Sequence, residues 1–93
     1  MTIGILQLEL SIPDAMSLKD KRRAILSLKD RIRTAHNVSI SEVSAQDEHR
    51  RAILGIAMVG TDRQYVEGAL SKLVDFVRMA RQVSLLDYQI EMM

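Results

Sequence analysis

The first stretch of the chain alternates between two kinds of side chain. From Ile3 to Ile12, one set of alternate positions is almost wholly apolar and the other set is mixed. The first set is Gly4, Leu6, Leu8, Leu10 and Ile12, and the second is Ile3, Ile5, Gln7, Glu9 and Ser11. A period of two residues predicts a β-strand with one buried face. Pro13 ends this strand, because proline cannot donate a hydrogen bond to a neighbouring strand.

Two later stretches repeat with the helical period. Ser17 and Asp20 have the spacing of a capping box, which predicts a helix from there to about Asn37. A second helix is expected to begin after Thr61 or Asp62. The apolar positions are Leu18, Ala24, Ile25, Leu28, Ile32 and Ala35 in the first helix, and Val66, Ala69, Leu70, Leu73, Val77 and Ala80 in the second. Each helix therefore has one apolar side, as expected of a helix packed on a sheet.

Three further strands complete the pattern. Residues 38–45 are rich in serine, and their apolar phase changes near Ser41 and Glu42, which predicts a bulge or an edge position. Residues 46–50 form a polar connection, and residues 51–60 are apolar on both faces, as expected of an interior strand. Residues 83–92 alternate again. The inward positions there are expected to be Leu86, Tyr88, Ile90 and Met92, and the outward ones Asp87, Gln89 and Glu91.

The order of these elements predicts the fold. A βαββαβ chain with right-handed crossovers places the first and third strands side by side at the centre of the sheet and both helices on one face. We therefore expect an α+β, ferredoxin-like sandwich over residues 1–93, a single domain with a four-stranded antiparallel sheet in the order 4-1-3-2. The expected core joins Leu6, Leu8, Leu10, Leu54, Ile56 and Met58 of the sheet to Ile25, Leu28, Val66 and Leu73 of the helices.

Composition limits the compartment and the chemistry. The chain has 93 residues, is 47% hydrophobic and contains no cysteine, which excludes disulfides, thiolate catalysis and cysteine-ligated zinc. Its start lacks the basic and apolar regions of a signal peptide, and no apolar run has the length of a membrane span. These features favour a cytoplasmic protein without membrane contact. The net charge is only +1, so any affinity for nucleic acid must come from how the charges are distributed.

The chain resembles the YlxP-like family of small bacterial proteins of unknown function. The segments that carry the resemblance are Ile3–Leu6, Leu8–Leu10, Ile12-Pro13, the basic helix start Ser17–Arg23, Asn37–Ser39, Glu42-Val43, Arg51–Gly55 and Leu85–Tyr88. The resemblance implies the ferredoxin-like fold. Genes of the family often lie among genes for translation initiation and ribosome maturation, so the resemblance also implies a role with RNA or the ribosome. Many relatives have a tryptophan where this chain has His49.

No catalytic or metal-binding motif stands out. His36 lies where a helix end is expected, and an imidazole there complements the helix dipole. Asp47, Glu48 and His49 are metal-ligand types, but adjacent residues rarely converge on one ion, so a solvated turn is the better interpretation. No nucleophile is paired with a base at a recognisable spacing. We expect a protein that is not an enzyme and needs no cofactor.

The start of the first helix breaks an electrostatic rule. Cations there oppose the positive end of the helix dipole, which favours anions. The residues expected to bind nucleic acid are Lys19, Lys21, Arg22, Arg23, Lys29 and Arg33. Lys21 lies in line with the apolar side, and its ammonium is expected to reach solvent near the preceding loop. Few acids follow at the spacing of helical ion pairs, so these cations are suited to phosphate.

Base stacking is not expected to contribute. The open face of the sheet would show Gln7, Glu9, Gly55, Ala57, Asp87, Gln89 and Glu91, which include no ring, and Tyr88 and Phe76 are expected to be buried. The first hypothesis is therefore an RNA-binding, ribosome-associated accessory factor that contacts the phosphate backbone.

The alternative is a protein-interaction or homodimerisation module. It would use an edge strand or the apolar residues of the open face. Those residues are expected to be Ile3, Ile5, Ile53, Val59 and Leu85.

Overall fold

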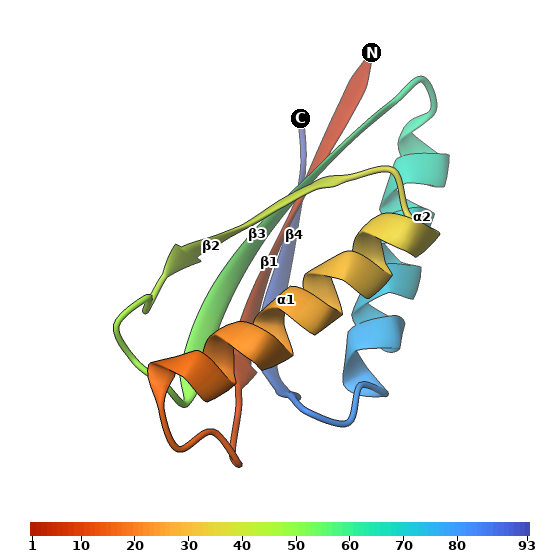
Figure 1. Ribbon diagram of the computed structural model, residues 1–93. Helices are drawn as coiled ribbons and strands as arrows, with labels where there is room; N and C mark the ends of the chain where they lie inside the picture. Colours follow the sequence, from red (N-terminus) through yellow and green to blue (C-terminus); the bar gives the residue numbers. More distant parts are fainter.

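The computed structural model describes residues 1–93 and has the predicted order of elements. These are β1 (Thr2–Ser11), α1 (Leu18–Ala35), β2 (Ser39–Ser44), β3 (Arg51–Gly60), α2 (Arg63–Arg78) and β4 (Ser84–Met92). The four strands form one sheet in the order β2-β3-β1-β4, and every neighbouring pair is antiparallel. Both helices cover the same face of this sheet (Figure 1). The predicted fold class and strand order are confirmed.

The core lies between the sheet and the two helices. Leu6, Leu8 and Leu10 of β1 are fully buried, and Leu8 lies between Leu54 of β3 and Tyr88 of β4 in the strand registers. All the residues predicted for the core are buried in one cluster, which also includes Val74 of α2. The period-two and helical patterns therefore identified the two surfaces that pack together.

Local hydrogen bonds set the ends of the helices. The Ser17 hydroxyl accepts from the Asp20 amide at 3.1 Å, as the capping box predicts. The Asp20 carboxylate accepts from the amide of Met16, one residue before the cap, at 3.0 Å. At the other end, the His36 amide donates to Ile32 and the helix stops there. Asp62 caps α2 by accepting from the amide of Gln64 at 3.1 Å.

Two bulges change the faces that side chains occupy. The pairing of β2 with β3 shifts between Glu42 and Ser44, slightly later than predicted. On β4, the residue facing Leu10 is Leu85 and the residue facing Glu9 is Asp87, so Leu86 is the extra residue. The prediction that Leu86 points inward is wrong, and its side chain is 56% exposed. Leu85 packs against the core, so it does not belong to the open face as expected.

Edge position also leaves Tyr88 more exposed than predicted. Its side chain is 43% exposed, and the Arg78 guanidinium lies over its ring at 5.5 Å from the centroid. Tyr88 faces the helix side, opposite Leu8, but β4 has no further strand beside it to cover the ring. Neither helix is long and apolar enough to cross a membrane.

Candidate functional site

The outer side of α1 gathers most of the predicted cations. We call the set Lys19, Arg22, Arg23, Lys29 and Arg33 the basic face. At about 100° per residue, these positions fall within an arc of roughly 120° around the helix. Lys29 is half-buried and the other four are exposed. Leu26 lies within the same arc and is 53% exposed, so the basic face surrounds one apolar side chain.

Arg33 differs from the rest of the basic face because it has partners. Its guanidinium lies 3.8 Å from the Asp30 carboxylate and donates to the Ile40 carbonyl at 3.2 Å. Asp30 is the acid that interrupts the basic face, and Arg33 neutralises it. Lys19, Arg22, Arg23 and Lys29 make no ion pair and no side-chain hydrogen bond. Four cations therefore remain free for an external anion.

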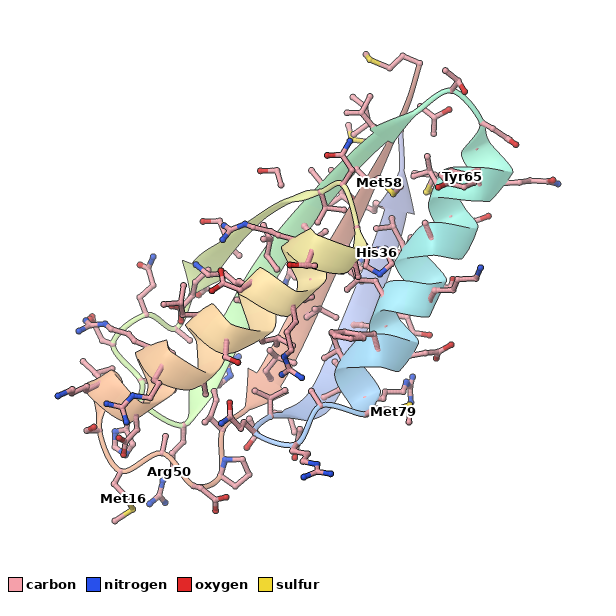
Figure 2. The ribbon with its side chains drawn as sticks, turned by 45° about the vertical axis from the view of Figure 1, so that its right-hand side comes forward. Met16, His36, Arg50, Met58, Tyr65 and Met79 are labelled. Atoms are coloured by element: carbon pink, nitrogen blue, oxygen red, sulfur yellow. The ribbon has the colours of Figure 1, made fainter.

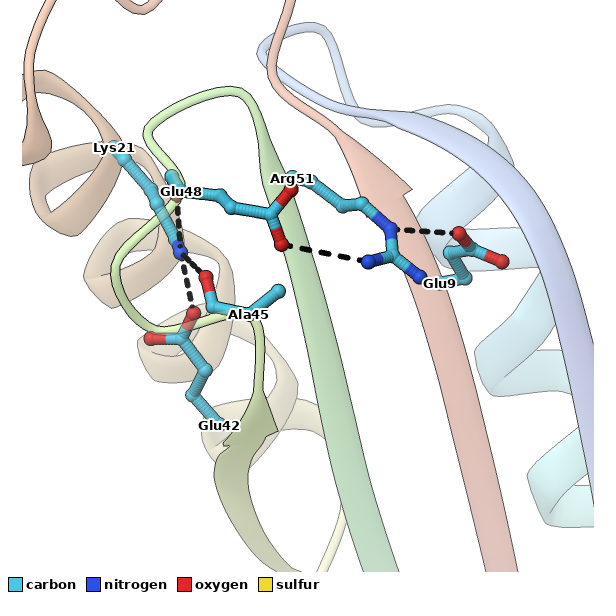
Figure 3. Close-up of polar contacts among 6 residues, drawn as sticks. All are labelled: Glu9, Lys21, Glu42, Ala45, Glu48 and Arg51. Atoms are coloured by element: carbon cyan, nitrogen blue, oxygen red, sulfur yellow. Dashed lines mark hydrogen bonds and ion pairs between the residues drawn. The ribbon is translucent and has the colours of Figure 1, made fainter.

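Lys21 does not belong to this surface. Its side chain is 1% exposed, and its ammonium donates to the carbonyls of Ala45 and Glu48, each at 2.6 Å (Figure 3). The Glu42 Oε2 atom lies 2.7 Å from the same ammonium, an ion pair whose geometry falls short of an aligned hydrogen bond. The prediction that Lys21 reaches solvent to bind nucleic acid is wrong. The connection after β2 supplies the two carbonyls, and β2 itself supplies the Glu42 carboxylate.

These contacts fasten the β2–β3 connection to α1. Glu42 is opposite Leu54 in the register and so lies on the helix side of the sheet. Ala45 has a φ of 61°, in the left-handed region where residues with a side chain are strained. The bond from Lys21 to the Ala45 carbonyl opposes that strain. Lys21 thus sets the position of residues 45–50 relative to the start of α1.

Arg50, which the sequence analysis did not select, lies at this same end of the molecule. Its guanidinium donates to the Ala15 carbonyl at 3.1 Å and approaches the Met16 sulfur at 3.7 Å. Figure 2 shows Arg50 beside Met16, and Met16 belongs to the loop that leads into α1. The position of Arg50 could have been predicted from the strand order. Pairing β1 with β3 puts Ser11 opposite Arg51, which brings Arg50 to the β1–α1 loop.

The axis of α1 is not suited to an anion. Asp14 and Asp20 line a hollow at the helix start together with Ile12, Ala15, Ala24 and Gln82. The Asp20 carboxylate already accepts from a backbone amide there. Two carboxylates at the helix start repel phosphate, so the usual anion site on the helix axis is blocked. An anion is instead favoured beside the helix, along the basic face.

The opposite side of the molecule has a different charge. A shallow hollow on the open sheet face is lined by Gln7, Glu9, Arg51, Ile53, Asp87, Tyr88 and Gln89. The Arg51 guanidinium pairs with Glu9 at 2.9 Å and with Glu48 at 3.4 Å (Figure 3). The hydrogen bond that Arg51 donates to the Glu9 carboxylate is the main reason that the pKa of Arg51 is raised above its ordinary value. Arg51 is therefore occupied, and the neighbouring Asp87 and Glu91 leave this face acidic.

The structure contains no cluster of metal-ligating side chains. No three side chains of the metal-ligating types histidine, aspartate and glutamate gather closely enough to hold an ion. His49, which follows Asp47 and Glu48, is exposed in the β2–β3 connection.

Comparison with known proteins gives a family but no activity. A family model described as a protein of unknown function, DUF503, matches residues 3–90. The uncharacterized protein YlxP of Bacillus subtilis (strain 168) is 39% identical over 75 residues, which cover 81% of this chain and 82% of that protein. The resemblance seen in the sequence is confirmed by both matches.

Proposed function

Because the chain belongs to the DUF503 family of YlxP-like proteins, whose function is unknown, we propose its role from its own surface. We propose a non-enzymatic, cytoplasmic accessory factor that binds the phosphate backbone of structured RNA, with a ribosomal particle as the RNA partner. The single observation that carries the proposal is the set of four cations on α1 that lack internal partners.

The charge distribution favours this proposal over an ordinary solvated helix. Asp30 is the acid on the outer side of α1, and it is already paired with Arg33. The four free cations therefore keep a local charge of about +4, although the net charge of the whole chain is only +1. The acids other than Asp30 lie outside the basic face, on the open sheet face, in the loops, at the start of α1, in β2 and on α2. A polyanion would approach the molecule from the outer side of α1.

The geometry favours backbone contacts over base recognition. The rise of an α-helix places the α-carbons of Lys19 and Lys29 about 15 Å apart along the axis, long enough to contact more than one phosphate. Arg50, beside the start of α1, would lengthen this surface. No exposed aromatic ring lies on the basic face. Bases are recognised by hydrogen bonds to their edges or by stacking on aromatic rings, whereas lysine and arginine mainly contact phosphates. Binding is therefore expected to be nearly independent of RNA sequence.

The test reverses three of the free cations, in a variant carrying Lys19→Glu, Arg22→Glu and Lys29→Glu. A matched control carries Arg63→Glu, Lys72→Glu and Arg81→Glu, which change the net charge equally at exposed positions without ion pairs. Affinity for two short RNA duplexes of unrelated sequence is measured by fluorescence anisotropy over a range of salt. Association with ribosomal particles is measured by gradient fractionation of lysate with and without nuclease.

The basic-face variant should lose about tenfold or more in affinity for both duplexes, and the control should lose much less. Each lost phosphate contact should lower the log–log salt slope by roughly 0.7–0.9, so three contacts lower it by roughly 2–3. Circular dichroism checks that both variants are folded. If the two variants bind alike, only net charge matters, and if the basic-face variant keeps its particle association, the RNA proposal fails.

A further inference from the structure

The outer edge of β4 is an exposed sheet edge that has less protection than the edge formed by β2. The sheet ends in β2 on one side and in β4 on the other. β2 has six residues, carries a bulge and is fastened to α1 through Glu42 and Lys21. β4 has nine residues and contains no lysine, arginine or proline, the residues that commonly prevent pairing with another chain. Its bulge at Leu86 lies near its start, so the segment from Tyr88 to Met92 is regular. Such an edge can accept a further strand.

The register shows which backbone groups of β4 face outward. Ile3 and Met93 exchange both of their backbone hydrogen bonds, at 3.3 and 2.8 Å. In an antiparallel ladder, such pairs alternate with pairs whose backbone groups point away from each other. Asp87, Gln89 and Glu91 are therefore bonded towards β1. The amides and carbonyls that face outward belong to Tyr88, Ile90 and Met92.

One of these outward groups is already occupied. The Tyr88 amide donates to the carboxylate of Asp87, its neighbour in the chain, at 2.8 Å. The other outward groups are the Tyr88 carbonyl and the amides and carbonyls of Ile90 and Met92. None of them forms a hydrogen bond with another part of the chain. Asp87 thus caps one end of the edge and leaves the segment from Tyr88 to Met92 available.

We propose that two copies of the chain pair antiparallel through this edge, with Ile90 facing Ile90 across a twofold axis. In this register the two Ile90 residues exchange two hydrogen bonds. Each Met92 amide donates to the Tyr88 carbonyl of the other copy, which adds two more. Four hydrogen bonds form without displacing Asp87. A register centred on Tyr88 would need its capped amide at the axis.

The side chains select the same register. It puts Tyr88 opposite Met92 on the helix side and Gln89 opposite Glu91 on the open side, where an amide can donate to a carboxylate. A register centred on Gln89 would place Asp87 opposite Glu91, and one centred on Glu91 would place two glutamates face to face. Like charges directly opposite are destabilising. The Ile90 register forms the four bonds and keeps the acids apart.

Pairing in this way leaves the basic faces free. Residues on the helix side meet residues on the helix side, so the joined sheet has all its helices on one face. α1 contacts β2 at the far edge from β4. The dimer would therefore present two basic faces to the same side. This inference does not depend on the proposed RNA binding, because its evidence is confined to β4.

The test measures self-association by sedimentation equilibrium over about 1–500 μM, a range chosen because a small interface gives weak affinity. Four variants, in two matched pairs, test the roles of the Tyr88 amide and the Met92 amide separately. Asp87→Ala frees the Tyr88 amide, and Asp87→Asn removes the charge but keeps an oxygen that caps it. Met92→Pro removes the outward amide, which edge strands tolerate, and Met92→Ala keeps that amide while shortening the side chain.

Wild-type protein should form dimers in the upper part of the range. Asp87→Ala should dimerise about tenfold more tightly than Asp87→Asn, because two further hydrogen bonds become available per dimer. Met92→Pro should dimerise about tenfold more weakly than Met92→Ala, with folding of both checked by circular dichroism. A wild-type monomer throughout the range, or equal dimerisation within either matched pair, would overturn the proposal.

Discussion

Replacing Lys21 with methionine removes the cation that fastens the β2–β3 connection to α1. The ammonium makes contacts of 2.6, 2.6 and 2.7 Å to Ala45, Glu48 and Glu42. Two of these contacts are hydrogen bonds to a charged group, which contribute about 1.5–3 kcal/mol each, so together they set a limit near 3–6 kcal/mol, to which the ion pair with Glu42 adds. Methionine fills a similar volume, so no large cavity is added to this loss.

Several relaxations reduce that limit. The residues from Gln46 to Arg50 are exposed, so their carbonyls can regain water if the connection opens slightly. The Glu42 side chain is 19% exposed and can turn partly towards solvent. Breaking a buried ion pair on one side commonly costs about 3–5 kcal/mol. We therefore expect Lys21→Met to lower the free energy of unfolding by about 3 kcal/mol, measured by urea unfolding followed by circular dichroism.

A double-mutant cycle with Glu42→Gln identifies the source of this loss. Glu42→Gln alone should cost about 1 kcal/mol, because it removes the ion pair but leaves the polar amide oxygen beside the ammonium, which keeps its two carbonyl partners. In the Lys21→Met background the same change should restore about 1 kcal/mol, because it removes an unpaired carboxylate from the interior. A loss under about 1 kcal/mol for Lys21→Met, or additive effects in the cycle, would refute the inferred role of Lys21.

The remaining predictions concern packing, and each is measured by urea unfolding. Gly68→Ala should stabilise α2 by about 0.5–1 kcal/mol, because a Cβ there meets nothing within 4 Å and alanine favours the helix. Gly4→Ala should destabilise the protein by about 1–3 kcal/mol, since its Cβ would lie 2.7 Å from side-chain atoms of Leu70 and Val66. Leu8→Ala should cost about 2–5 kcal/mol because Leu8 is fully buried at the sheet centre, and a loss below about 1 kcal/mol would contradict its place in the core.

The fold could be predicted because the hydrophobic periods leave few arrangements. Leu6 and Leu54 share a strand phase that must face the apolar side of a helix, and right-handed crossovers then fix the strand order. The bulge at Leu86 could not be located in this way. Leu85 and Leu86 are both leucine, so either could begin the inward-facing set of alternate residues in β4. The sequence pattern therefore does not show that Leu86 is the bulged residue.

The candidate site was harder to predict, because it depends on contacts between distant segments. Helical spacing placed Lys21 near the apolar side, yet its burial depends on Glu42 and the carbonyl of Ala45, more than twenty positions away in the sequence. Their position follows from the bulge in β2 and from the backbone conformation of Ala45, which no local pattern specifies. The exposure of the free cations of α1 was easier to predict, because the helical period shows which residues lie on the outer side of a helix.

The pairing of β1 with β4 also affects how the chain folds during synthesis. The ladder joins Ile3 to Met93, so it closes a loop that spans nearly all of the described residues, and contacts between such distant residues slow folding. β4 is also the last of these six elements to be synthesised, and chains grow by about 5–20 residues per second. Until it arrives, β1 has one unpaired edge beside incompletely covered leucines. During these seconds the nascent chain is most exposed to association with other unfolded chains.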